Sequence, residues 1–499
     1  MPVKTLIKGS VACIFLLCHQ VFSQSLSTGY SPQRNYGPSA ETMKAISASF
    51  NEEIKNNSAE NKKVREMVNE SLTNLRKYLA SMDSSHFIME SDSTTRYLKK
   101  IVDHIAEKNQ KIIKDKFYVF TSRTSVPNAS NLGKGVILVN LGLINKLDSE
   151  PAIAYVLCHE IAHQVLDHVI SGIKKGAEIY HDKDFQKELK KAQKKEYNSL
   201  SLTEALRIKY LSHFTLHRRE HEYEADSLGL ILFYNAGYSP LDAVSEIQFL
   251  DSIDLPLYAA PINYRNYFEF SKYPFRNDWL TIDPNLGQLG GNIDSLYMPP
   301  DSLKTHPDCP MRAKAIERIF TRENMNTTNH FLLSTNYLFH REISCFERVE
   351  HFLSTEQFGL ALYDALQVSA RYPDNLYLKC AIANSLCEIC RAQTNHAFSA
   401  VVDFPDTRNA KSYNEFLSFL HNLSASQLKN ITIYYCTENI INLKKEDPYC
   451  RYIDFLVKGM DKSKTEYAAL VADYQKDNTL DAHYKSLLDE KFKINLKKK

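Results

Sequence analysis

The amino-acid sequence predicts a mainly α-helical protein with more than one domain. Apolar residues recur with helical spacing over residues 148–170 and again over residues 201–236. In the last third of the chain, similar patterns indicate successive helices at 346–353, 358–370 and 377–391. A length of 499 residues exceeds what one hydrophobic core usually supports, so we expect roughly three domains.

Residues 1–23 have the pattern of a secretory signal peptide. Lys4 and Lys8 precede a run of apolar residues, and Ser23 offers a small residue for cleavage. Cys18 lacks the small preceding residue of a bacterial lipoprotein signal, so lipidation is disfavoured. We therefore expect an exported protein, located in the periplasm or cell envelope or secreted.

Two segments flank or interrupt the central domain that we expect at residues 95–328. Residues 24–94 are helical and charged, and an amphipathic stretch at 43–79 is expected to pack on that domain. Residues 255–304 are rich in Tyr, Phe, Pro, Asn and Gly and show no clear periodicity. This second segment is either a lid-like loop over a cleft or a disordered linker.

The helix predicted at residues 148–170 carries a His-Glu-x-x-His pattern. His159 and His163 are four positions apart, so both rings project from one helix face and can meet at a single zinc ion. Glu160 can then reach a water molecule beside that ion. The helix is apolar over much of its circumference, and buried polar side chains need partners. The alternative is a pair of core histidines that neighbouring groups satisfy.

A catalytic zinc ion needs a third protein ligand, and the helix at 201–236 offers one. Ser201 and Glu204 have the spacing of a capping box at its start. Further along, Glu222 and Asp226 lie on one helix stripe. Two small residues on that stripe, Ala225 and Gly229, allow close approach to another helix.

Glu222 could thus ligate the metal, while Asp226 holds a histidine ring from behind. The sequence predicts one Zn²⁺ per chain on this interpretation. A solvated acidic helix face is the alternative.

Taken together, these motifs resemble the zinc metallopeptidases of the HtpX, BepA and CAAX-prenyl-protease type, peptidase family M48. The family signature, His-Glu-x-x-His followed on a later helix by Glu-x-x-Ala-Asp, appears without departure at 159–163 and 222–226. Further similarity is found at 127–143, 236–240 and 305–312.

The resemblance implies a gluzincin-type metallopeptidase domain of helices plus a small β-sheet, followed by an α-helical tetratricopeptide-like domain at 329–499. It makes His159, His163 and Glu222 the zinc ligands. Glu160 becomes the general base, and Asp226 a partner that orients His159.

The same resemblance assigns roles to two downstream residues and one strand. His306 would approach the metal from a loop, either to block the open coordination position or to stabilise the oxyanion. Arg312 would anchor that loop or help to bind substrate, unless it is a helix-surface arginine. The predicted substrate strand consists of Val136, Ile137, Leu138 and Val139, and it could pair with an extended peptide.

Other histidines are expected to be structural. His168 follows His163 by five positions, which turns it away from the ligand face of a continuous helix. His213, His217 and His221 recur every four residues and read as a polar face, with an adventitious metal site as the alternative.

The C-terminal helices resemble tetratricopeptide repeats in Ala361, Ala365 and the Pro-Asp-Asn break at 373–375. BepA-like proteins carry such repeats after the peptidase domain. A domain of this kind would present a groove to a client or envelope-assembly partner.

Composition excludes some classes of function. The 61 basic and 59 acidic residues nearly balance, which gives no electrostatic case for nucleic-acid binding. No segment after the signal peptide has the roughly 18 uninterrupted apolar residues of a transmembrane helix. Eight cysteines remain after the signal peptide, so disulfides are possible but their pairing cannot be deduced.

The expected function is therefore that of an exported zinc metalloendopeptidase acting on protein or peptide substrates, with envelope quality control suggested by the resemblance. A competing hypothesis is a chaperone or binding protein whose metal site is inhibited or structural. Cleavage of prenylated peptides is a weaker alternative, because that branch of the family works within membrane helices.

Overall fold

The chain forms two compact units in the computed structural model. We call residues 33–255 and 296–344 the N-terminal unit, and residues 1–32, 256–295 and 345–499 the C-terminal unit. The described part of the 255–304 segment, residues 256–281, thus belongs to the C-terminal unit. The structure describes residues 26–33, 37–84, 87–193, 219–251, 253, 256–281, 309–328, 331–333, 336–406, 409–441, 446–460, 462, 464–476 and 482–488.

The N-terminal unit contains a sheet whose described strands run in the order β1, β2, β4, β3. Their bounds are β1 (Ile88–Met89), β2 (Tyr118–Ser122), β3 (Ala129–Asn131) and β4 (Val136–Asn140). β2 and β4 pair in parallel, with Tyr118 opposite Val136, and both outer strands pair antiparallel. This order puts β4 inside the sheet and β3 at an edge.

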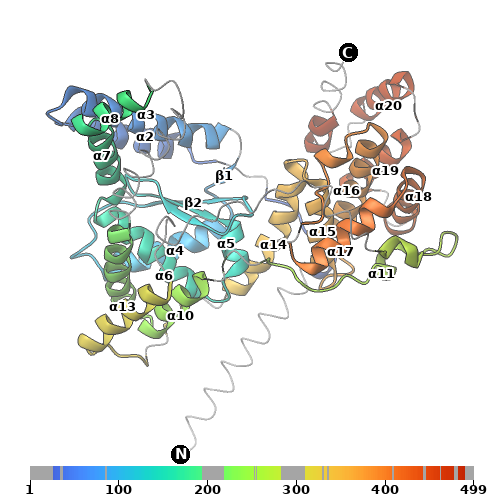
Figure 1. Ribbon diagram of the computed structural model, residues 1–499. Coiled ribbons are helices and arrows are strands. Elements are labelled where there is room, and N and C mark those ends of the chain that lie inside the picture. The colour runs from blue at the N-terminus through green and yellow to red at the C-terminus, as the bar shows by residue number, and fades with distance from the viewer. Residues whose placement is uncertain are drawn as a thin grey trace, which may run out of the picture. The chain divides into compact units, whose positions relative to one another are not determined.

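The side chains of β4 alternate between two apolar layers. Val136 and Leu138 pack with the N-terminal helices α2 (Ala40–Asn56) and α3 (Lys62–Ser84). Ile137 and Val139 face the layer that contains α4 (Ser93–Lys108) and α6 (Glu150–Val165). Figure 1 shows the two pairs of helices on opposite sides of the sheet. Coverage of both faces explains the unbroken apolar run of this strand.

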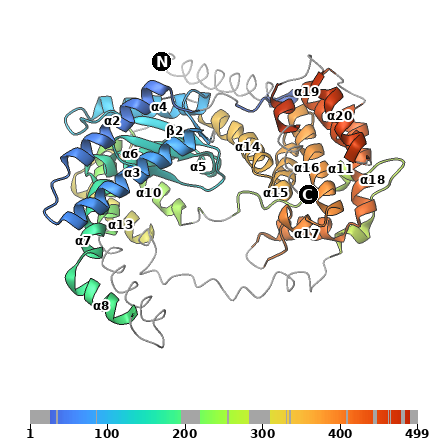
Figure 2. The same ribbon diagram turned by 90° about the horizontal axis from the view of Figure 1, so that it is seen from above.

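Helices α2 and α3 lie side by side over their face of the sheet (Figure 2). The side chain of Ser39 caps α2 by accepting a hydrogen bond from the backbone N–H of Thr42. Glu53 of α2 accepts hydrogen bonds from Lys134 at 2.8 Å and from Lys174 at 3.1 Å. These ion pairs connect α2 to the turn before β4 and to α7 (His168–Tyr180).

The prediction of a single helix over residues 148–170 is wrong. α6 begins after Ser149, whose side chain accepts a hydrogen bond from the N–H of Ala152, and it ends at Val165. Asp167 has a left-handed backbone with φ 56°, and α7 begins at the next residue. Apolar residues recur on both sides of Asp167, so their periodicity does not reveal that the helix breaks there. Asp adopts the left-handed backbone conformation more readily than most residues.

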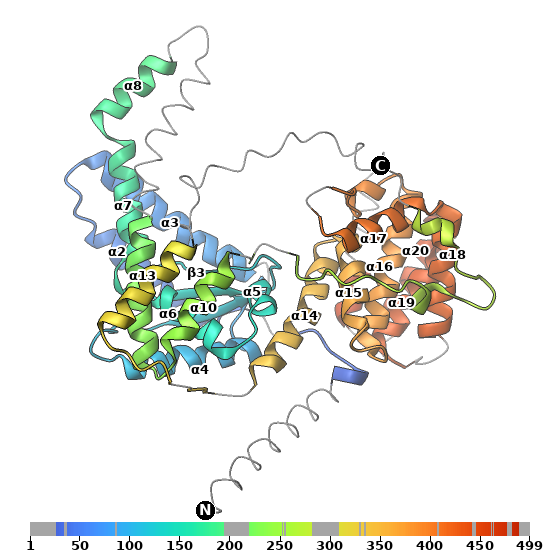
Figure 3. The same ribbon diagram turned by 60° about the horizontal axis from the view of Figure 1, so that its bottom comes forward.

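The helix at residues 219–235 packs closely on α6. A Cβ atom on Gly229 would lie 3.3 Å from both the Cα and the N atom of His159, so the missing side chain sets the approach of the two backbones. α10 (Pro240–Leu250) lies beside α6 and α13 (Cys309–Arg322), as Figure 3 shows. The predicted capping pair of this helix, Ser201 and Glu204, lies outside the described residues.

The described part of the C-terminal unit is helical. The remaining elements of both units are α5 (Leu141–Lys146), α8 (Lys183–Gln193), α11 (Arg265–Phe268), η1 (Asn277–Leu280), α14 (Tyr337–Ser354), α15 (Phe358–Ser369), α16 (Leu376–Thr394), η3 (Phe398–Ala400), α17 (Lys411–Asn422), α18 (Ala425–Cys436), η4 (Thr437–Ile441), α19 (Pro448–Gly459) and α20 (Lys464–Lys476). Of these, α16 packs against α15, α18 and α19, while α14 contributes its first residues to the N-terminal unit and the rest to the C-terminal unit.

The predicted fold class is confirmed: a mainly α-helical domain with a small sheet, followed by a helical C-terminal region. Within the described residues, no helix combines the length and the apolar character needed to cross a bilayer.

Candidate metal centre

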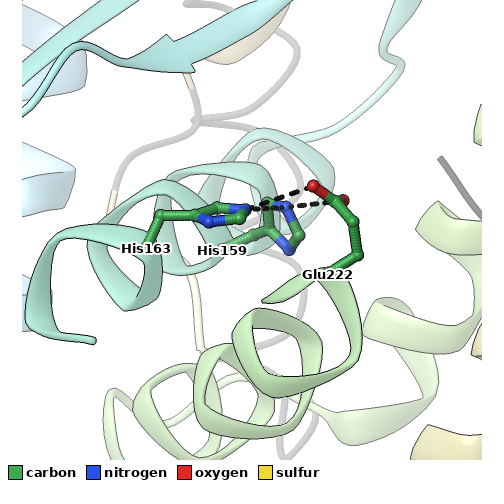
Figure 4. A group of neighbouring side chains, drawn as sticks. All are labelled: His159, His163 and Glu222. Carbon is green, nitrogen blue, oxygen red and sulfur yellow. Dashed lines mark hydrogen bonds and ion pairs between the residues drawn. The ribbon is translucent and has the colours of Figure 1, made fainter. Parts of the chain in front are cut away.

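Three side chains from two helices converge in the N-terminal unit. His159 and His163 project from α6 one turn apart, and Glu222 reaches them from the helix at 219–235 (Figure 4). The Nε2 atoms of the two histidines are 3.0 Å apart. Each of these atoms lies 3.5 Å from a different oxygen of the Glu222 carboxylate. The fold therefore brings the three predicted ligands together.

These atoms fit a tetrahedral divalent cation. Ligands about 2.1 Å from a tetrahedral zinc ion are about 3.4 Å from one another, and the separations here are 3.0 and 3.5 Å. The rings of His159 and His163 are inclined at 79°, so their ring nitrogens can point at a common position. Two imidazole nitrogens and one carboxylate oxygen form a donor set that catalytic zinc sites use.

Asp226 lies behind His159, one helical turn after Glu222. Its Oδ1 atom is 3.0 Å from Nδ1 of His159. Arg312 of α13 donates from Nε to Oδ2 at 2.6 Å and from Nη2 to Oδ1 at 2.7 Å. Arg312 is only 2% exposed, so the alternative of a helix-surface arginine is wrong. The structure places this guanidinium where it holds the Asp226 carboxylate.

Burial and close charges set the electrostatics of this cluster. Burial opposes the charged carboxylate, but hydrogen bonds from Arg312 and His159 hold the pKa of Asp226 below its usual value. Burial also opposes the charged form of His159, yet hydrogen bonds with Asp226 and Glu222 raise its pKa to about 10. Burial and the neighbouring His159 charge lower the pKa of His163 to about 3. Near neutral pH, His159 therefore carries an extra proton and His163 is neutral, and a divalent cation would displace the extra proton of His159.

Glu160 is held by the edge strand β3. The backbone N–H of Asn131 donates to Oε2 of Glu160 at 2.6 Å, and the Asn131 side-chain amide donates to the Glu160 backbone carbonyl at 2.9 Å. Asn131 also accepts a hydrogen bond from the N–H of Gly133. Sequence analysis missed the role of Asn131. The local sequence feature that pointed to this residue was its position just before a glycine-containing turn.

The strand predicted to pair with substrate cannot do so. Its residues Val136, Ile137, Leu138 and Val139 are buried, and β4 pairs with β2 on one side and with β3 on the other. The sheet's two edge strands in the described part of the chain are β1 and β3, and β3 forms the free edge beside β4.

The register of β3 decides which of its groups face that free edge. Asn128 and Leu132 hydrogen-bond to β4. In an antiparallel ladder, the main-chain groups of the alternate residues Ala129 and Asn131 then point away from β4. The N–H of Asn131 does so, because it donates to Glu160.

The expectation that His168 turns away from the ligands is also wrong. Because α6 ends at Val165, His168 begins a new helix, and its Nδ1 atom lies 2.9 Å from Nδ1 of His163. Its Nε2 atom is 3.1 Å from Oε2 of Glu224, and its ring stacks on that of His221. Burial lowers the pKa of His168 to about 4, so this ring is neutral near pH 7.

Three histidines considered in the sequence analysis lie outside the described residues: His213, His217 and His306. The two roles expected for His306, blocking the metal or stabilising the oxyanion, therefore stay predictions.

Comparison with known proteins supports the chemistry of this site. Residues 92–320 match the family model described as Peptidase family M48. No curated protein matches the chain. The match confirms the prediction that the protein is an enzyme, a metalloprotease that hydrolyses peptide bonds.

Proposed function

We propose that this metalloprotease, with its M48-like domain at 92–320, is an exported zinc endopeptidase that cleaves misfolded envelope or extracellular proteins. His159, His163 and Glu222 would hold one Zn²⁺ per chain. The main support for the proposal is the convergence of these three ligand side chains beside Glu160. Glu160 lies on α6, the helix that also supplies the two histidines.

Bound zinc would supply Lewis acidity to the attacking water and to the scissile carbonyl. Glu160 accepts the proton of that water and passes it to the leaving amine nitrogen. Asp226, held by Arg312, keeps the ring of His159 in its ligand orientation.

The edge of β3 would bind the substrate backbone. Ala129 and Asn131 direct main-chain groups to that edge, and Asn131 is bonded to Glu160, so a peptide paired there would pass close to the general base. Main-chain pairing recognises an extended peptide with little dependence on its side chains. Such recognition suits unfolded protein segments of varied sequence.

The substitution Glu160→Gln tests the catalytic assignment. The variant should bind one zinc ion per chain and melt at the temperature of the parent, yet its cleavage of an unfolded protein such as casein should fall by at least about 100-fold. A parent activity that survives a chelator, or a Gln variant as active as the parent, would contradict the proposal.

The C-terminal unit would dock a client or an envelope-assembly partner. Three features resemble tetratricopeptide repeats: Ala361 and Ala365 are fully buried in α15, and Asn375 caps α16 by accepting a hydrogen bond from Leu378. If the protein is instead a chaperone, parent and Glu160→Gln variant would suppress aggregation of a client equally, and neither would cleave it.

Export depends on residues 1–23, which lie outside the described residues. N-terminal sequencing of the protein recovered from its native cells tests this part of the proposal. A mature chain that starts at Gln24 supports export, whereas an intact chain that starts at Met1 or Pro2 contradicts it.

A further inference from the structure

The two histidines of the metal centre have different outer partners. His159 directs its Nδ1 atom at the carboxylate of Asp226, at 3.0 Å. His163 directs its Nδ1 atom at a second imidazole, that of His168, at 2.9 Å. Histidines that bind metals are usually backed by a carboxylate, a backbone carbonyl or water, so an imidazole in this place is unusual.

The hydrogen-bond directions along this second chain are mutually consistent. Nε2 of His163 faces His159 and Glu222, so its proton belongs on Nδ1, which donates to His168. His168 accepts through Nδ1 and therefore carries its own proton on Nε2. That atom lies 3.1 Å from Oε2 of Glu224, which accepts it. Every donor in the series meets one acceptor.

His168 is fixed in place by its surroundings. The left-handed backbone of Asp167 ends the path of α6, so His168 begins a new helix and its ring lies against His163. The His168 ring then stacks on His221, with the centroids 3.9 Å apart and the planes inclined by 6°. A buried ring held by two hydrogen bonds and one stacking partner can restrain the ring that it contacts.

A second metal site is the competing interpretation of these residues, because His168, His221 and Glu224 also bring ligand atoms within 4.8 Å of one another. Ring geometry argues against it. The lone pair of a ring nitrogen lies in the ring plane. The nearly parallel planes of His168 and His221 therefore do not meet at one ion, whereas the planes of His159 and His163, inclined at 79°, can. One nitrogen of His168 is also already engaged by His163.

We propose that His168 is a positioning residue for His163, and that Glu224 holds His168 in the tautomer that this role requires. The inference rests on the proposed zinc ligands and goes beyond them. It gives the metal centre two outer supports of different chemistry, a buried Asp–Arg pair for one ligand and a His–Glu pair for the other.

Zinc affinity of the purified protein, measured by competition with a chromophoric chelator, tests this inference. His168→Ala should weaken zinc binding by about 10-fold to 100-fold. His168→Gln should recover part of this loss, because an amide can accept from His163 and donate to Glu224. The visible spectrum of the Co²⁺-substituted protein should shift in His168→Ala, which a purely structural defect elsewhere would not cause.

His181→Ala is a matched control, because it removes a histidine that caps the far end of the same helix. It should leave zinc affinity and the cobalt spectrum unchanged. Unchanged zinc affinity in His168→Ala would overturn the inference while leaving the proposed function intact. A loss of one of two bound zinc ions in His168→Ala would overturn it in favour of a second metal site. Unchanged zinc affinity in Glu222→Gln would overturn both the inference and the proposed function.

Discussion

Arg312 and Asp226 form a two-point ion pair, with Nε–Oδ2 and Nη2–Oδ1 distances of 2.6 and 2.7 Å. Both side chains are almost fully buried, at 3% and 2% exposure. They come from α13 and from the helix at 219–235, so the pair joins two helices behind the ligand His159. A buried ion pair of this kind tolerates the loss of both charges better than the loss of one.

Arg312→Met should therefore lower the free energy of unfolding by about 3 to 5 kcal/mol, because the buried Asp226 carboxylate loses its guanidinium partner. The double variant Arg312→Met with Asp226→Asn removes both charges of this pair and should recover part of that loss. Glu222, whose Oε2 atom lies 3.6 Å from Nη2 of Arg312, loses a partner in both variants. Urea unfolding monitored by circular dichroism measures both effects. If the double variant is as unstable as the single one, the ion pair is not the cause.

Gly229→Val should destabilise the protein by about 1 to 3 kcal/mol. Even a Cβ atom at this position would lie 3.3 Å from the α6 backbone at His159, and the added methyl groups would force the two helices apart. Zinc affinity should fall as well, because the displaced helix carries Glu222.

Gly172 of α7 is a matched control, since a Cβ there meets nothing within 4 Å. Gly172→Val should change the free energy of unfolding by less than about 0.5 kcal/mol. Equal destabilisation of the two variants in a thermal melt would show that close packing of Gly229 on α6 is unimportant.

Ala129→Pro should weaken substrate binding without disturbing the sheet. The N–H of Ala129 points away from β4, so proline removes a group at the free edge and leaves the ladder to β4 intact. Loss of one main-chain hydrogen bond should raise KM by about 3-fold to 10-fold. Steady-state cleavage of a fluorogenic peptide measures this change.

Ala129→Val keeps the backbone N–H and is the control for the proline variant. Its KM should match that of the parent. A proline variant with the KM and kcat of the parent would mean that substrate does not pair with β3.

Glu246 of α10 should make stability depend on pH. Burial, together with the nearby charge of Asp148, raises the pKa of its carboxyl from 4.5 to about 8. Tyr337 of α14 is a further titratable group that interacts with it, and Oε1 of Glu246 has no hydrogen-bond partner among the described residues. The folded protein therefore holds this proton more tightly than the unfolded chain does.

The resulting stabilisation is complete below about pH 4.5 and is lost as the pH rises through 8, with a slope of up to about 1.4 kcal/mol per pH unit. Glu246→Gln should remove this slope, so the variant should exceed the parent in stability most at pH 9. Denaturant unfolding at pH 5, 7 and 9 measures the difference, and the exposed Glu317→Gln serves as the control. Parallel pH profiles for Glu246→Gln and parent would contradict the prediction.

The spacing of residues within single helices was enough to predict most of the metal centre. His159 and His163 share a helix face because they are one turn apart, and Glu222 and Asp226 share another for the same reason. Small residues at 225 and 229 indicated the close helix approach that Gly229 now shows. Helical periodicity is a local property, so a short stretch of sequence reveals it without knowledge of its neighbours.

Only the tertiary structure decided the partners that surround these ligands. His168 contacts His163 because one left-handed residue, Asp167, separates α6 from α7, and apolar periodicity does not report such a break. β4 was mistaken for an accessible strand because an apolar run does not tell which neighbours pair with it, whereas the sheet order leaves β3 at the edge. The contacts of Asn131 with Glu160 and of Arg312 with Asp226 join segments 29 and 86 residues apart, and such pairings arise only when the whole domain packs.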